Sequence, residues 1–145
     1  MHDSDKTYRA IGRFIFEFSQ AEYTIRHYLA QEIGLDEEHF SAVVESYDVG
    51  VLCTVSKEVF GKSRAKSNAA EINALINDFR ALSDHRNRVA HGLWVPFKDG
   101  GTVHHVPRTN LKSRMAADQA VVLEKLADKT CDLRAALDRA FSRME

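Results

Sequence analysis

Hydrophobic residues in the first part of the chain recur at intervals of three and four residues, the spacing of one helix face. This spacing predicts a first helix that begins near Ser4 and ends before Gly34. Glycine suits the left-handed conformation that commonly follows a helix C-terminus. The core-facing positions of this helix are Ile11, Phe14, Ile15, Phe18, Ile25, Leu29 and Ile33.

Three more helices are expected before residue 92. The second begins at Asp36, and the two glutamates that follow are well placed in its first turn. A shorter third helix covers residues 51–60. The fourth opens with an N-cap pattern, in which Asn68 precedes Glu71 by three positions. Its apolar positions are Ile72, Leu75, Ile76, Phe79 and Leu82.

After residue 92 the hydrophobic period changes from that of a helix to that of a strand. Residues 93–97 and 102–106 flank an Asp-Gly turn, which predicts a β-hairpin. A last helix runs from about Ser113 to the C-terminus, with Val122, Leu126, Leu133, Leu137 and Met144 on one side. The pattern therefore predicts an all-α bundle of about five helices with one small hairpin after the fourth, in a single domain over residues 1–145.

Composition adds limits rather than a function. The chain of 145 residues has 20 basic and 21 acidic residues and a formal charge of -1, so any RNA contact needs a local basic patch. No apolar run approaches the roughly 18 residues of a membrane span, and no signal-peptide core is visible. We expect a cytoplasmic protein without a membrane partner. Cys53 and Cys131 match no metal spacing, and we expect neither metal nor cofactor.

The chemistry-bearing stretch lies at the end of the fourth helix, in the sequence Asp-His-Arg-Asn-Arg-Val-Ala-His-Gly over residues 84–92. Arg86 is followed by Asn87 and, after four intervening residues, by His91. Arginine can hold a phosphate, and histidine can transfer a proton near neutral pH. These residues suffice to cut RNA without a metal. A structural alternative stays open, in which His91 caps helix carbonyls and Arg86 pairs with a buried acid.

Helix geometry separates these residues into two faces. At about 100° per residue, Arg86 falls within the apolar stripe of the fourth helix. A second, polar face carries Arg80, Asp84, Asn87 and His91. An ideal helix places Arg86 about 140° from His91. Both residues can face one phosphate only if the last turn loosens or a second copy of the helix supplies one of them.

Glu22 lies in the middle of the apolar stripe of the first helix. A carboxylate there needs a partner, because an unpaired buried charge is strongly destabilising. Arg86, on an inward stripe of its own helix, is the natural candidate. Glu22 then either positions Arg86 in a site or forms a structural ion pair with it, and the sequence leaves both open.

The order Arg86, Asn87, three residues, His91 on the penultimate helix of a small bundle resembles the HEPN superfamily. The string Arg-Asn-Arg-Val-Ala-His-Gly is similar to that of bacterial HEPN members of unknown function. The resemblance covers nearly the whole chain and implies a metal-independent endoribonuclease, often found in toxin–antitoxin or phage-defence systems. It also implies a homodimer in which two such motifs face one cleft, with RNA and an antitoxin protein as partners.

The resemblance assigns a role to each motif residue. Arg86 would hold the scissile phosphate, His91 would act as general acid or base, and Asn87 would orient His91 or contact the phosphate. Glu22 and Asp84 would support them, and Arg80 would contact the substrate.

Two departures leave other functions open. Some HEPN toxins carry a modified tyrosine two residues after the histidine, where this chain has Leu93. Other members of the superfamily are noncatalytic. The alternatives to a ribonuclease are therefore a noncatalytic HEPN-like module that binds a protein or nucleotide, and a helical scaffold whose motif caps a helix and sets a dimer interface.

Overall fold

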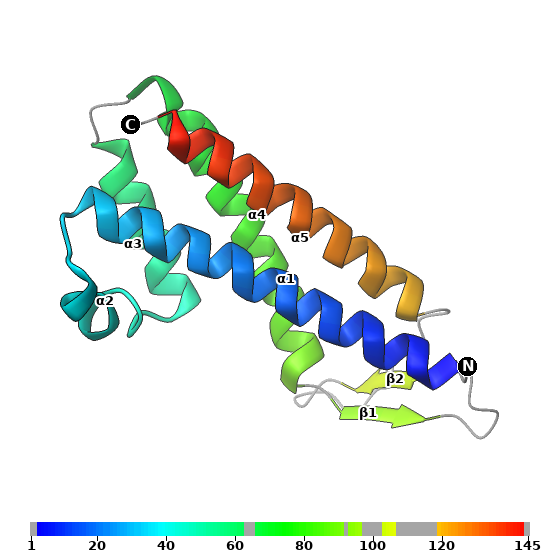
Figure 1. Ribbon diagram of the computed structural model, residues 1–145. Helices are drawn as coiled ribbons and strands as arrows, with labels where there is room; N and C mark the ends of the chain where they lie inside the picture. The colour runs from blue at the N-terminus through cyan, green and yellow to red at the C-terminus, as the bar shows by residue number, and fades with distance from the viewer. Residues whose placement is uncertain (1–2, 63–65, 92, 97–102, 107–118, 144–145) are drawn as a thin grey trace. The chain divides into compact units, whose positions relative to one another are not determined.

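The computed structural model describes residues 3–62, 66–91, 93–96, 103–106 and 119–143. Its helices confirm the all-α class (Figure 1). They are α1 (Asp3–Glu32), α2 (Glu37–Val43), α3 (Val49–Gly61), α4 (Lys66–His91) and α5 (Gln119–Ser142). Two short strands, β1 (Leu93–Pro96) and β2 (Val103–Val106), lie between α4 and α5 in the chain.

The chain divides into two compact units, each assembled from separate parts of the sequence. The first unit contains Met1–Phe18 and Leu82–Thr130, and the second contains Ser19–Ala81 and Cys131–Glu145. The helices α1, α4 and α5 contribute residues to both units.

The first unit has a small apolar core. Its buried side chains come from three helices and include Ala10, Phe14, Phe18, Leu82, Leu123 and Ala127. Outside this core, the guanidinium of Arg13 on α1 contacts Glu124 at 2.5 Å and Asp128 at 2.6 Å, both on α5. These groups are well exposed, so they fix the pairing of two helices more than they add stability.

The two strands pair in antiparallel register, with Leu93 opposite Val106 and Pro96 opposite Val103 (Figure 1). The Asp-Gly turn expected between them lies outside the described residues.

The second unit has more buried side chains than the first, among the residues whose burial is described. Aliphatic and aromatic side chains from α1, α3, α4 and α5 are buried there, among them Ile25, Leu29, Leu52, Phe60, Ile72, Ile76, Phe79, Leu137 and Phe141. The rings of Phe60 and Phe141 have centroids 4.7 Å apart, and Tyr28 stacks on Phe141 at 4.5 Å. Residues far apart in the sequence are thus joined by direct aromatic packing.

The connection from α1 to α2 follows local sequence signals. Gly34 has a φ of 75°, and Leu35 N–H donates to the Ala30 carbonyl at 2.9 Å while Gly34 N–H donates to that of Gln31. This pattern is a Schellman motif, and Gly34 has the left-handed conformation that the sequence predicted. Asp36 then caps α2 by accepting from the His39 N–H at 2.9 Å, which confirms the predicted start of this helix.

Several helix details predicted from the sequence are wrong. The helix α4 begins at Lys66, so Asn68 lies inside it and is not its N-cap. Its side-chain amide instead donates to the Ala140 carbonyl at 3.5 Å. Val122 was expected in the core but is 45% exposed, and Ile33 is exposed near the end of α1. The expected start of the last helix at Ser113, and Met144 near its end, lie outside the described residues.

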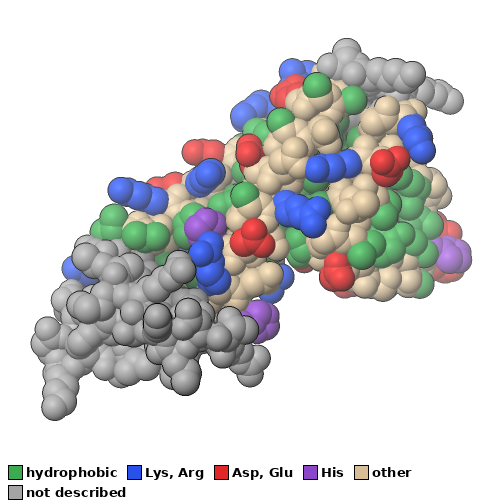
Figure 2. Space-filling view, turned by 180° about the vertical axis from the view of Figure 1, so that it is seen from behind, with side chains coloured by type: hydrophobic (Ala, Val, Ile, Leu, Met, Phe, Trp, Pro, Cys, Tyr) green, Lys and Arg blue, Asp and Glu red, His purple; other side chains and the backbone are tan. Residues whose placement is uncertain are grey.

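Charges of both signs are mixed on the face drawn in Figure 2, in keeping with the formal charge of -1. None of the described helices combines the length and apolar composition that a membrane span requires.

Candidate functional site

The helix α4 carries most of the predicted site residues and remains an α-helix through His91. Asp84, Asn87 and His91 are all exposed on it, and so is Arg80, which belongs to the second unit. Exposure of these four side chains agrees with the polar face that helix geometry predicted.

Arg86 differs from these neighbours because it is partly buried. Its guanidinium carbon lies 5.1 Å from the centroid of the Phe18 ring, in the range of a cation–π contact. Its Nε is buried and has no hydrogen-bond acceptor among the described residues. Arg86 therefore lies on the inward side of α4, and at least one of its donors is unused there.

The regular helix end bears on two arrangements that the sequence left open. One required a loosened last turn, so that Arg86 and His91 of one chain reach the same group. Because α4 stays helical to His91, that loosening is absent from the structure. A joint action of the two side chains therefore calls for a second copy of the helix.

His85 was not singled out from the sequence, yet folding perturbs its imidazole. Its Nδ1 lies 3.1 Å from a terminal nitrogen of Arg88. A guanidinium can only donate, so Nδ1 accepts and the ring proton belongs on Nε2. Partial burial, followed by the charges of Arg88 and Lys129, lowers the pKa of His85, and Asp84 opposes this. The spacing of three residues between His85 and Arg88 was the sequence signal for this contact.

The end of α4 is locally basic although the chain is not. Residues 80–91 contain three arginines and one acid, Asp84. Arg88 also contacts the Asp84 carbonyl through Nε at 3.4 Å, so its guanidinium is held along the helix surface. A nearly neutral protein that binds RNA needs a local concentration of positive charge of this kind.

Glu22 finds a partner within its own helix. Its carboxylate lies 3.6 Å from Nε of Arg26, and its side chain is 25% exposed. Arg26 in turn donates to the carbonyls of Val44 at 2.5 Å and Tyr47 at 2.8 Å. Glu22 belongs to the second unit and Arg86 to the first, so the pairing expected between them stays a prediction.

Metal and thiol chemistry find no support in the described part of the chain. No group of three or more histidine, cysteine, aspartate or glutamate side chains gathers there as a metal site would require. Cys53 is buried, and burial raises the pKa of its thiol, which makes it a poor nucleophile at neutral pH.

Comparison with known proteins adds no relative to this picture. The chain matches no protein-family model, no curated protein and no solved structure.

Proposed function

We propose that the protein is a metal-independent endoribonuclease of the toxin or phage-defence type, built on a HEPN-like bundle and active as a homodimer. The observation that carries the proposal is the state of Arg86. A structural arginine in a partly buried position ordinarily pairs with an acid. Among the described residues, Arg86 has no such partner, and its buried Nε lacks an acceptor. A phosphate oxygen would accept from the terminal nitrogens of its guanidinium, since Nε itself is buried.

In this proposal the RNA supplies its own nucleophile. The imidazole of one His91 takes the proton of a ribose 2′-hydroxyl, whose oxygen then forms a bond to phosphorus. The bond from phosphorus to the 5′-oxygen breaks, and that oxygen takes the proton from the imidazolium of the same His91. Arg86 stabilises the charge that develops on the phosphoryl oxygens, and Asn87 orients His91 or contacts the phosphate. The products are a 2′,3′-cyclic phosphate and a 5′-hydroxyl.

Two copies of the chain are part of the proposal because of the separation of about 140° between Arg86 and His91 on an ideal helix. A twofold axis beside the end of α4 would bring Arg86 of one copy toward His91 of its partner. Asp84 and Arg80, exposed on the same helix, would flank that cleft as supporting and substrate-binding residues.

The first test is cleavage of end-labelled mixed-sequence RNA by the purified protein in excess EDTA. We expect cleavage that leaves 2′,3′-cyclic phosphate ends. Arg86→Ala and His91→Ala should each lower the rate by about 10²- to 10⁴-fold, since each removes a group that acts in the transition state. Arg139→Ala and His39→Ala, which alter exposed residues outside α4, are matched controls and should cleave normally. Equal cleavage by all variants would identify a contaminating nuclease and refute the assignment.

A mixture of the two inactive variants tests the shared site. If Arg86 of one copy works with His91 of the other, mixed dimers regain one complete pair, and up to about a quarter of the wild-type activity should return on random exchange. If both residues act within one chain, the mixture stays inactive. Each variant alone, at the same total concentration, is the control.

The second candidate is a noncatalytic HEPN-like module that binds a nucleotide or a protein. If the chain is a monomer, the separation of Arg86 from His91 on a regular helix favours this noncatalytic function, since Arg86 could then hold an anion without His91. Sedimentation and RNA titration separate the two functions. A monomer that binds RNA without cutting it, and loses binding in Arg86→Ala, would establish the module instead.

A further inference from the structure

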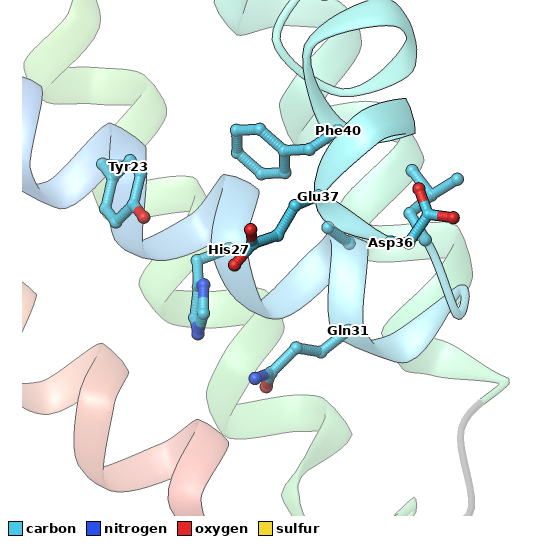
Figure 3. Close-up of a pocket in the computed structure, with 8 residues that line it drawn as sticks. Tyr23, His27, Gln31, Asp36, Glu37 and Phe40 are labelled. Atoms are coloured by element: carbon cyan, nitrogen blue, oxygen red, sulfur yellow. The ribbon is translucent and has the colours of Figure 1, made fainter.

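A pocket of about 560 Å³ lies between the C-terminal part of α1 and the start of α2, within the second unit. Its chemistry is set by three rings, two carboxylates and one amide (Figure 3). These belong to Tyr23, His27, Phe40, Asp36, Glu37 and Gln31. None of them belongs to the polar face at the end of α4.

The rings form connected walls. The centroids of Tyr23 and His27 are 6.0 Å apart with the rings nearly parallel, and those of Tyr23 and Phe40 are 6.3 Å apart with the rings tilted by 59°. Tyr23 is 58% exposed, so its ring faces the solvent side of the pocket rather than the core. Aromatic faces carry negative electrostatic potential, and such a group of faces attracts a cation.

The charged groups of the pocket have the same sign as those faces. Both lining carboxylates are negative, and no lysine or arginine is among the lining residues. Asp36 is already committed, because its carboxylate caps α2 and contacts the His39 ring. Hydrogen bonding to the His39 side chain lowers the pKa of Asp36, so it stays ionised. Glu37 makes no ion pair among the described residues, and Figure 3 shows its carboxylate reaching toward His27.

We propose that this pocket binds an alkylated ammonium group, of the trimethylammonium type. A cation of this kind is bulky and weakly hydrated, and it needs no directed hydrogen-bond acceptors. Several aromatic faces and one nearby carboxylate therefore suit it better than they suit a primary amine or a metal ion. An anion is disfavoured by Asp36 and Glu37, and a purely aliphatic ligand gains nothing from them.

The test is a titration of the full chain with choline and with tetramethylammonium, monitored by calorimetry and by the NMR chemical shifts of the pocket residues. The matched control ligand is dimethylbutanol, the uncharged carbon isostere of choline. We expect both cations to bind and to shift the resonances of Tyr23, Glu37 and Phe40, while the isostere binds at least about tenfold more weakly. Equal binding of the isostere, or no binding of either cation, would overturn the proposal.

Variants locate the binding in this pocket. Tyr23→Leu, Phe40→Leu and Glu37→Gln should each weaken the affinity for tetramethylammonium by about threefold to thirtyfold. None of these residues is buried, so the variants should fold, which their melting curves check. Tyr8→Leu alters an equally exposed tyrosine of α1 that does not line the pocket, and should bind normally. If Tyr8→Leu weakens binding as much as Tyr23→Leu does, the site lies elsewhere.

The same chemistry occurs in free small molecules and in trimethylated lysine within a protein. A peptide that contains trimethyl-lysine, compared with the same peptide unmodified, distinguishes the two sources. Tighter binding of the modified peptide than of choline indicates a protein ligand, and the reverse indicates a small molecule. Binding of both peptides alike, independent of methylation and of Tyr23, would contradict an alkylammonium site.

Discussion

Two arginines on different helices, Arg26 and Arg86, illustrate two uses of the same side chain. Arg26, in the second unit, is only 8% exposed and is surrounded by oxygen atoms. It donates to two backbone carbonyls and pairs with Glu22. Arg86, in the first unit, is partly buried against the Phe18 ring, and its buried Nε has no acceptor among the described residues.

The two arginines differ in whether the fold uses their N–H groups as hydrogen-bond donors. The hydrogen bonds of Arg26 connect α1 to the segment between α2 and α3, so this guanidinium stabilises the fold. The ring of Phe18 stabilises the charge of Arg86 without using its N–H groups as donors. An arginine held in this way keeps those groups for a ligand. Burial and sequence position alone would not have separated the two.

The largest expected difference between the two arginines is in their contribution to the free energy of unfolding. Arg26→Met should lower the free energy of unfolding by about 3 kcal/mol, because one buried carbonyl, one partly buried carbonyl and a carboxylate lose their partner. Arg86→Met, which makes the same chemical change, should cost at most about 1 kcal/mol. Urea unfolding monitored by circular dichroism measures both. Equal losses in the two variants would mean that Arg86 is as structural as Arg26 and would remove the main support for its catalytic role.

A smaller effect is expected from Glu22. Glu22→Gln should lower the free energy of unfolding by about 1 kcal/mol, since its side chain is partly exposed and the ion pair with Arg26 is long. The loss should disappear in the Arg26→Met background and persist in the Arg86→Met background. The opposite pattern would show that Glu22 pairs with Arg86 in solution, as the sequence first suggested.

The smallest effect concerns His85, close to Arg86 in sequence. Partial burial, with the charges of Arg88 and Lys129, lowers the pKa of His85 in the folded chain. The unfolded chain therefore takes up this proton first, so the contribution of His85 to stability is present above its ordinary pKa and is lost as the pH falls below it. His85→Gln should flatten this acid-side decline slightly, as measured by melting temperature against pH. A steeper decline in the variant would mean that the pKa is shifted the other way.

Local signals in the sequence predicted those parts of the fold that local physics decides. Gly34 and Asp36 were placed correctly because a left-handed residue and an N-cap each act on the next few residues only. Asn68 was wrongly predicted to be the N-cap of α4, because this helix begins two residues before it. An N-cap pattern that lies within a longer helix does not mark the start of that helix. Val122 was wrongly predicted to be buried, because the buried face of α5 is built partly from small residues such as Ala127 and Thr130, which contribute little to a hydrophobic pattern.

For the candidate site, the sequence likewise predicted which helix face each residue occupies but not the contacts made on folding. Helix periodicity placed Arg86 inward and Asn87 and His91 outward, because an angular position on a regular helix follows from residue number. The partners of Arg26 were not predictable, since backbone carbonyls have no residue-type signature in a sequence. The lowered pKa of His85 was missed because its largest cause, desolvation on folding, has no signature in the sequence, and Lys129, a smaller cause, is far away in the chain and close only after folding.

The pocket between α1 and α2 is built from a single segment of the chain. All the residues that line it fall within one stretch of chain, residues 23–40, and the Gly34 turn and the Asp36 cap fix the path between its two walls. Bringing such near neighbours together requires little loop-closure entropy. We therefore expect that this stretch, transferred to the corner between two helices of an unrelated bundle, would keep its shape and the alkylammonium binding proposed for it.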